Sequence, residues 1–307
     1  MSKKKKNIIL ENIKLVSAGA KGVAVGKTEE GKTVLVSGAV PGDLVNARVK
    51  KAKSKYYEAE AIEIIQKSPY RVEPKCIHFG VCGGCKWQNL SYEKQLNFKQ
   101  EEVYNNIKRI GGIENFETLP ILGSEEEYFY RNKMEFSFSN ARWLTQYEIS
   151  SEENFGNKDA LGFHIPGMWS KILDLQECFL QESPSNEIRL AVRNYAIENG
   201  LDFFDVRNQE GFLRTLMLRQ NSKGEWMVLF QLYREEKENR EQLFNFVLQK
   251  FPQIKTLVFA INPKQNDSIY DLDVQTYFGE GFIYEEMDGL KFKIGPKSFF
   301  QTNYKQA

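Results

Sequence analysis

The feature that most constrains the fold of this 307-residue chain is a cysteine-rich stretch, residues 75–87, with the sequence KCIHFGVCGGCKW. It contains Cys76, Cys82 and Cys85, although the whole chain has only four cysteines. Five residues separate the first two thiols and two glycines separate the last two, so one loop can bring all three to a single centre. The spacing therefore predicts a metal site around which the flanking segments must fold.

The fourth cysteine, Cys178, is separated from Cys85 by 92 intervening residues. Iron–sulfur cubanes take four cysteine thiolates, so we predict that Cys76, Cys82, Cys85 and Cys178 hold a [4Fe-4S] cluster. Structural zinc is the alternative, but zinc ligands usually come as two close pairs and Cys178 has no near partner in the sequence. The remaining alternative is a set of buried free cysteines.

The two histidines carry weaker signals. His78 lies between the clustered cysteines and is expected to be a loop residue, with zinc ligation as its alternative. His164 has no histidine near it in the sequence, so we expect a hydrogen-bonded strand residue rather than a catalyst.

Residues 1–67 predict a small all-β barrel. Short alternating apolar runs are punctuated by glycines, as in GVAVG, TVLVSG and LVNARVKK. Residues 1–75 contain 16 Lys and Arg against 8 Asp and Glu, a net charge of +8; because the whole chain carries +1, the remainder carries −7. Such an asymmetry predicts a polyanion-binding module, with a solvated charged surface as the alternative. The lysines predicted to contact nucleic acid are Lys50, Lys51, Lys53 and Lys55, just before two tyrosines.

Four further segments follow the barrel. Residues 68–90 form a proline-containing linker and the cysteine loop, and residues 91–123 begin with a helix expected over 91–111, with Ser91 as its N-cap. Residues 124–290 interleave helices near 185–199 and 238–250 with strands, which predicts an α+β domain. The strands are expected at 128–139, 160–165, 171–175, 213–220, 226–233 and 255–261, with a further short strand at 290–294, and the polar segment before residue 160 is expected to be a long loop or hairpin tip. Residues 291–307 are expected to begin another domain. No apolar run approaches the roughly 20 residues of a membrane helix, and no secretory signal is recognisable, so we expect a cytoplasmic monomer.

Three separated motifs carry a resemblance to a known family. Residues 82–100 read CGGCKWQNLSYEKQLNFKQ, residues 130–138 read YRNKMEFSF, and residues 294–303 read IGPKSFFQTN. Together with the order of the barrel strands, they resemble the bacterial RNA uracil-5-methyltransferases that carry a TRAM domain, a small OB-like RNA-binding barrel, and a [4Fe-4S] cluster. The resemblance covers essentially the whole chain, and it implies an RNA substrate, with 23S ribosomal RNA expected and transfer RNA as the alternative.

The resemblance also implies a mechanism and site residues. In this family a cysteine adds to carbon 6 of a flipped-out uracil, carbon 5 takes a methyl group from S-adenosylmethionine (SAM), and a base removes the carbon 5 proton. By position, Gln301 matches a residue at the SAM and target-base site, Phe299 an aromatic beside the base, and Arg131 a basic residue near the uridine. Asn303 lies in the same motif. Structural roles are the alternative: Phe299 and Phe300 could belong to the core, and Arg131 could pair with one of the acidic residues 125–127. In relatives the helix after the cysteine loop packs on the catalytic domain.

Two features depart from the family pattern. No glycine-rich turn follows a strand and opens a helix, and all four cysteines are assigned to the cluster, so none is left as nucleophile. We therefore expect a C-terminally truncated member with no catalytic residue of its own, inactive alone, whose Rossmann-like methyltransferase domain is largely missing. The alternatives are a non-catalytic RNA-binding iron–sulfur protein and an iron–sulfur redox sensor.

Overall fold

The computed structural model describes residues 8–151 and 158–307, which form two compact units. The first comprises the described residues up to Gly80 together with Cys85–Glu125, and the second comprises Val81–Gly84 and the described residues from Glu126 to Ala307. The cysteine loop is thus divided between the two units, and each unit is described by itself.

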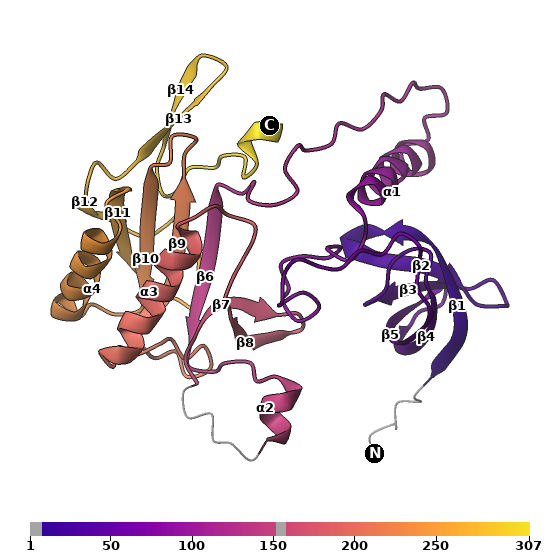
Figure 1. The fold of residues 1–307 in the computed structure, drawn as a ribbon, viewed down its shortest axis with the longest axis horizontal. Helices are drawn as coiled ribbons and strands as arrows, with labels where there is room; N and C mark the ends of the chain where they lie inside the picture. Colours follow the sequence, from indigo (N-terminus) through magenta and orange to yellow (C-terminus); the bar gives the residue numbers. More distant parts are fainter. Residues whose placement is uncertain (1–7, 152–157) are drawn as a thin grey trace. The chain divides into compact units, whose positions relative to one another are not determined.

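The first unit contains a closed five-stranded barrel, in agreement with the predicted small β-barrel (Figure 1). Its strands, in the barrel order β1-β2-β3-β5-β4, are β1 (Ile9–Gly19), β2 (Val23–Lys27), β3 (Thr33–Ser37), β5 (Tyr56–Gln66) and β4 (Leu44–Ala52). Apolar side chains alternate along each strand and fill the interior, and Leu15, Ala24, Val34, Val36 and Val45 are fully buried. The alternating pattern of the sequence therefore has its physical cause in the inward and outward faces of the barrel.

A buried ion pair ties the linker to the barrel. Asp43, which has no solvent exposure, accepts hydrogen bonds from Arg71 at 2.8 and 2.6 Å and from the amide N–H groups of Val40 and Ser68. Burial by itself raises the pKa of Asp43, but Arg71 and the two amides outweigh it, so the pKa lies below its ordinary value. The start of the linker is therefore fixed on the barrel.

The helix predicted over 91–111 divides into α1 (Tyr92–Asn105) and a π-helical turn (Asn106–Ile110). Ser91 occupies the predicted N-cap position, although its side chain makes no capping hydrogen bond. No residue of α1 is buried in this structure. The following residues 111–125 have no regular secondary structure, and the Ser124 amide donates to the Tyr92 hydroxyl at 2.7 Å.

The second unit is built on a seven-stranded sheet in the order β12-β11-β10-β9-β6-β7-β8 (Figure 1). Its strands are β6 (Lys133–Ser139), β7 (Ala160–Ile165), β8 (Met168–Asp174), β9 (Leu213–Gln220), β10 (Trp226–Leu232), β11 (Ile254–Ile261) and β12 (Gln275–Phe278). Among the described strands of this sheet, only the β10–β11 pair is parallel. The helices α3 (Ser185–Glu198) and α4 (Lys237–Lys250) lie on one face and agree with the two helices predicted there.

The two faces of this sheet differ. Phe136, Leu216 and Phe230 pack with helix residues such as Ile188 and Phe244 in the main core. On the opposite face, a smaller cluster joins strand residues to the hairpin β13 (Ile283–Met287) and β14 (Leu290–Ile294). One row of that face is polar, with Ser137, Thr215 and Gln231 side by side on β6, β9 and β10.

Several local predictions differ from the structure. The segment 128–132 is not a strand, because the ladder of β6 begins only at Lys133. The polar loop before β7 contains a short helix, α2 (Gln146–Ser150), and its residues 152–157 lie outside the described part of the chain. At the C-terminal end, residues Tyr304–Gln306 form a single 3₁₀ turn.

Candidate functional site

The C-terminal motif, residues 295–303, is held on the sheet of the second unit by two buried residues. Asn132 donates from Nδ2 to the Gln301 carbonyl at 2.8 Å, and its amide N–H donates to the Thr302 carbonyl at 2.8 Å. Arg219 on β9 donates to the carbonyls of Gly295 at 3.3 Å and Ser298 at 3.0 Å. The motif is therefore fixed through its backbone carbonyls, and the Lys297 side chain anchors it further by donating to the Tyr270 carbonyl at 3.2 Å and the Leu272 carbonyl at 2.6 Å.

Arg219 serves this segment as a buried cation. Arg219 is only 3% exposed. Burial lowers the pKa of its guanidinium, and the charge of nearby Glu135 acts in the opposite direction. Its Nε has no hydrogen-bond partner among the described residues. The cost of burying this guanidinium is offset mainly by the two carbonyls of the motif.

The structure brings Arg131 next to the C-terminal motif, because Arg131 immediately precedes Asn132. The Arg131 amide donates to the Leu180 carbonyl at 2.8 Å, and its Nε donates weakly to the Lys133 carbonyl at 3.4 Å. Among the described side chains, Arg131 forms no ion pair with the acidic residues 125–127, which was the alternative predicted for it.

The side chains of the motif have different environments. Phe299 is 83% exposed and Gln301 is exposed, whereas Phe300 packs against Phe292 with ring centroids 5.8 Å apart. Asn303 is partly buried and has a polar or ring interaction in the structure. The core alternative therefore holds for Phe300 but not for Phe299.

None of the four cysteines forms a disulfide in the described part of the chain. Cys76 and Cys85 belong to the first unit, whereas Cys82 and Cys178 belong to the second, where both pack against the main core. Within residues 8–151 and 158–307, no group of three or more His, Cys, Asp or Glu side chains could hold a metal ion. The predicted [4Fe-4S] ligand set, which draws on both units, therefore stays a prediction.

The surroundings of Cys82 and Cys178 nevertheless suit thiolate ligands. The Cys82 Sγ accepts a hydrogen bond from the Gly84 amide at 3.4 Å. The Asn186 side chain holds the backbone of Cys178 on both sides, accepting from its N–H at 2.9 Å and donating to its carbonyl at 3.1 Å. Amide donors to sulfur and a fixed backbone are features that stabilise anionic sulfur ligands.

Arg189 supplies a buried positive charge beside Cys178. Burial lowers the pKa of Arg189 to about 10, and the charge of Cys178 acts in the opposite direction. The guanidinium bonds to the carbonyls of Leu175 and Gln176, and no carboxylate within the described residues forms an ion pair with it. Its Nε lacks a hydrogen-bond partner in the same set of residues. A buried cation of this kind fits an anionic group bound at Cys178.

The predicted basic surface of the barrel is partly neutralised. Lys50 pairs with Glu60 at 2.6 Å and Lys51 with Glu58 at 3.1 Å. Lys53 and Lys55 are exposed in the turn between β4 and β5 and form no ion pair with any described residue. Lys32 belongs to the same surface, because its Nζ lies 3.9 Å from the centroid of the Tyr57 ring. The sequence did not predict this contact, since Lys32 and Tyr57 are far apart along the chain.

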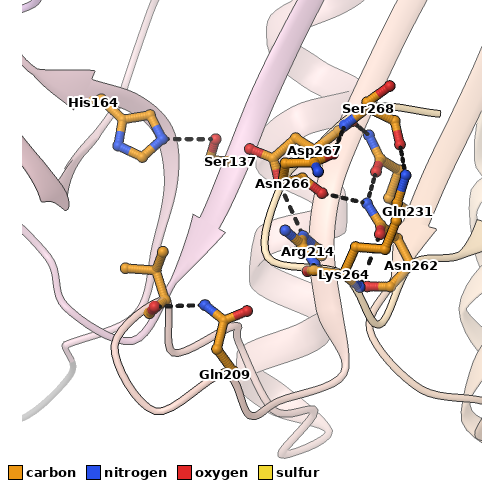
Figure 2. Close-up of polar contacts among 11 residues, drawn as sticks. Ser137, His164, Gln209, Arg214, Gln231, Asn262, Lys264, Asn266, Asp267 and Ser268 are labelled. Atoms are coloured by element: carbon orange, nitrogen blue, oxygen red, sulfur yellow. Dashed lines mark hydrogen bonds and ion pairs between the residues drawn. The ribbon is translucent and has the colours of Figure 1, made fainter. Parts of the chain in front are cut away.

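His164 is a strand histidine, in agreement with the sequence-based prediction. It lies on β7, and its Nε2 is 3.4 Å from the Ser137 Oγ on β6 (Figure 2). The side chain is exposed on the polar part of the helix-free face.

Comparison with known proteins gives consistent matches. Residues 13–62 match the TRAM domain family. The chain is 48% identical over 291 residues to an uncharacterized RNA methyltransferase of Bacteroides thetaiotaomicron, covering 94% of this chain and 64% of the relative. It is 45% identical to an uncharacterized RNA methyltransferase of Porphyromonas gingivalis, and this match covers 96% of this chain and 64% of the relative. The chain thus spans less than two thirds of the length of these relatives.

A solved structure with a similar fold is that of the Pyrococcus abyssi tRNA (uracil-54, C5)-methyltransferase in complex with S-adenosyl-L-homocysteine. The TM-score is 0.64 at 25% identity, and the match covers 96% of this chain and 62% of that one. This finding corrects the expected fold class, in which a methyltransferase domain is largely missing, because nearly all elements of this chain have counterparts in a methyltransferase. The comparisons also give no support to the expected inactivity.

No helix in the described part of the chain is long and apolar enough to cross a membrane. The barrel in the first unit coincides with the TRAM match, and the relatives align along nearly the whole chain. The chain is therefore similar to RNA methyltransferases along nearly its whole length, and its barrel matches the TRAM domain.

Proposed function

We propose that the protein takes part in SAM-dependent methylation of carbon 5 of a uracil in RNA. The names of the relatives support RNA methylation, and the similar tRNA (uracil-54, C5)-methyltransferase, solved with S-adenosyl-L-homocysteine, supports uracil carbon 5 and a SAM-derived ligand. The observation that carries the proposal is the pair of Asn132 hydrogen bonds, since they join Arg131 to the segment that contains Gln301. Arg131 and Gln301 are 170 positions apart in the sequence, and both are expected to serve one target base.

Each side chain of this region has a proposed role that follows from its chemistry. The exposed ring of Phe299 offers a face for stacking a flipped base, and the Gln301 amide can both donate to and accept from polar groups of the base or of SAM. Arg131 supplies positive charge near the RNA backbone, and Asn303 continues the motif. SAM supplies the methyl group when bound. Tritium release by the chain itself, tested below, would contradict the predicted absence of a catalytic nucleophile from this chain.

The barrel is proposed to bind the RNA through Lys53 and Lys55, with Lys50 and Lys51 contributing where their ion pairs open. Ribosomal RNA is proposed as the substrate, and transfer RNA is the alternative. A cytoplasmic monomer remains part of the proposal.

A [4Fe-4S] cluster on Cys76, Cys82, Cys85 and Cys178 is proposed as a structural group. The supporting observations are the amide donor to Cys82, the fixed backbone of Cys178 and the buried charge of Arg189. When bound, the cluster would link the cysteine loop to the segment that follows β8, and we assign it no part in methyl transfer.

The function can be tested by tritium release. RNA transcripts containing [5-³H]uridine are incubated with the purified protein and SAM, because replacement of the carbon 5 hydrogen releases tritium to water. Parallel reactions use ribosomal and transfer RNA. SAM-dependent release that is lost in Gln301→Ala is the expected result, and methyl incorporation without tritium release would contradict methylation at carbon 5. RNA binding without either signal would favour the non-catalytic RNA-binding alternative.

A further inference from the structure

The helix-free face of the sheet in the second unit contains a small recess near β6, β7 and β8. It encloses about 30 Å³, and its polar or aromatic lining residues include Ser137, His164, Trp169, Ser170, Arg214 and Asp267. This is room for one water molecule or one exocyclic group rather than for a whole ring. A planar ligand would therefore lie across the mouth of the recess.

Trp169 provides a flat surface at this mouth. Its side chain is 64% exposed although it lines the recess, and it follows the tight β7–β8 turn, in which Gly167 adopts a φ of +78°. Large aromatic side chains on a strand are usually buried, so an exposed indole beside a polar recess points to a ligand. Gly83 of the cysteine loop packs closely against this turn: a β-carbon at Gly83 would lie 3.1 Å from the His164 carbonyl oxygen.

Positive charge lies beside the indole. The Arg207 side chain donates to the Ser170 Oγ at 3.0 Å, which holds it next to Trp169. Arg207 is exposed and pairs with no carboxylate among residues 8–151 and 158–307. A guanidinium whose charge is not neutralised, beside an exposed aromatic ring, is complementary to a phosphate attached to a stacked base.

The floor of the recess is built from fixed polar groups (Figure 2). His164 and Ser137 interact at 3.4 Å, and the Asp267 Oδ1 accepts from the Arg214 Nε at 2.9 Å. The loop that carries Asp267 is anchored by Asn262, which is fully buried and donates to Gln231 and to the Asn266 carbonyl. The recess therefore presents donors and acceptors in fixed positions, as base-edge recognition requires.

We propose that this recess is a second RNA contact, at which an unpaired nucleobase stacks on Trp169 and directs an exocyclic group toward Ser137, His164 and Asp267. Arg207 contacts the adjoining phosphate. The proposal rests on the proposed action on RNA, but it concerns a base other than the one to be methylated. Single-stranded RNA is favoured over duplex because a base paired in a helix cannot expose its face to Trp169.

The test measures the affinity of the full chain for a fluorescent single-stranded RNA by anisotropy. The same RNA with abasic nucleotides and a duplex of the same length serve as comparisons. Trp169→Ala is expected to weaken binding of the single strand about tenfold, and Trp169→Phe is expected to retain most of the affinity. Neither variant should change binding of the abasic strand. Tyr270→Ala is the matched control, because Tyr270 is an aromatic residue of the same unit and is 72% exposed.

Equal affinities of the parent and Trp169→Ala for the single strand would overturn the proposal. An equal loss on the abasic strand and on the duplex would also overturn it, since the effect would not depend on a base. If Trp169→Ala binds normally while the parent protein still releases tritium from RNA, this inference fails and the proposed function stands. If the parent protein releases no tritium but its binding of the single strand depends on Trp169, this inference stands and the proposed function fails.

Discussion

The Nδ2 atom of Asn132 donates a hydrogen bond to the carbonyl of Gln301 at 2.8 Å, across 169 positions of sequence. Asn132 is only 4% exposed, and its own amide bonds to the next residue of the same segment, Thr302. The residue that precedes β6 is therefore joined to the C-terminal motif, although neither side of the contact lies in a helix or strand.

The first prediction follows from this contact. Asn132→Ala should leave the Gln301 carbonyl without its side-chain donor and loosen residues 295–303, at a cost of about 1 kcal/mol in stability. Methyl transfer should fall by at least about tenfold, because small displacements of positioning groups are costly in catalysis. Hydrogen exchange of the 295–303 peptide measures the loosening directly. Asn194→Ala, at an exposed position of α3, is the control, and an unchanged exchange rate in Asn132→Ala would contradict the role of the contact.

The buried Asp43–Arg71 pair should stabilise the barrel. Asp43→Asn should lower the free energy of unfolding of the first unit by about 3 kcal/mol, because Arg71 then lacks its charged partner. The folded-state pKa of Asp43 lies below its ordinary value of 3.8, so the stabilisation is complete above that value and is lost as the pH falls through the lower, folded pKa. Denaturant unfolding between about pH 2 and 7 measures both effects. Glu11→Gln, an exposed carboxylate on β1, should change neither the stability nor the pH dependence.

The two barrel lysines that form no ion pair with described residues should dominate the electrostatic part of RNA binding. Lys53→Gln with Lys55→Gln should weaken binding and reduce the slope of log K against log salt by up to about 1.4, or about 0.7 for each lost contact with a single strand. Lys50→Gln should have a smaller effect, because Glu60 already neutralises that lysine in the structure. Lys237→Gln on α4 controls for net charge. A double variant with the parent salt slope would show that the β4–β5 turn does not contact phosphates.

The cluster prediction is tested by metal content. Protein purified without oxygen should contain about four irons and four sulfides per chain, and Cys82→Ser and Cys178→Ser should both lose them. His78→Ala should retain the iron, because this residue is expected to be a loop residue rather than a ligand. Stoichiometric zinc without sulfide would contradict the cluster, and retention of the full iron content by Cys178→Ser would remove Cys178 from the ligand set.

Local patterns predicted most of the regular structure. The alternating runs of the barrel and the strands β7, β9, β10 and β11 lie close to their predicted positions, since one side of each strand faces a core and the period of two is visible in the sequence. The strand β13 and the short helix α2 were missed, whereas a short strand was predicted where β14 lies. These are short elements, and β13–β14 is stabilised largely by contacts with distant strands such as those of Met227 and Leu229.

The sequence by itself determined the motifs: four thiols at a spacing typical of a cluster, a basic β-rich module, and three strings that resemble RNA uracil-5-methyltransferases. Only the tertiary structure decided which residues meet. Asn132 with Gln301, Arg189 with the segment before Cys178, and Trp169 with Arg214 and Asp267 are brought together by sheet order and loop anchoring, which no local pattern encodes. The physical reason is that hydrogen bonds between distant segments depend on the packing of the whole unit, whereas strand and helix periodicity depends on neighbouring residues.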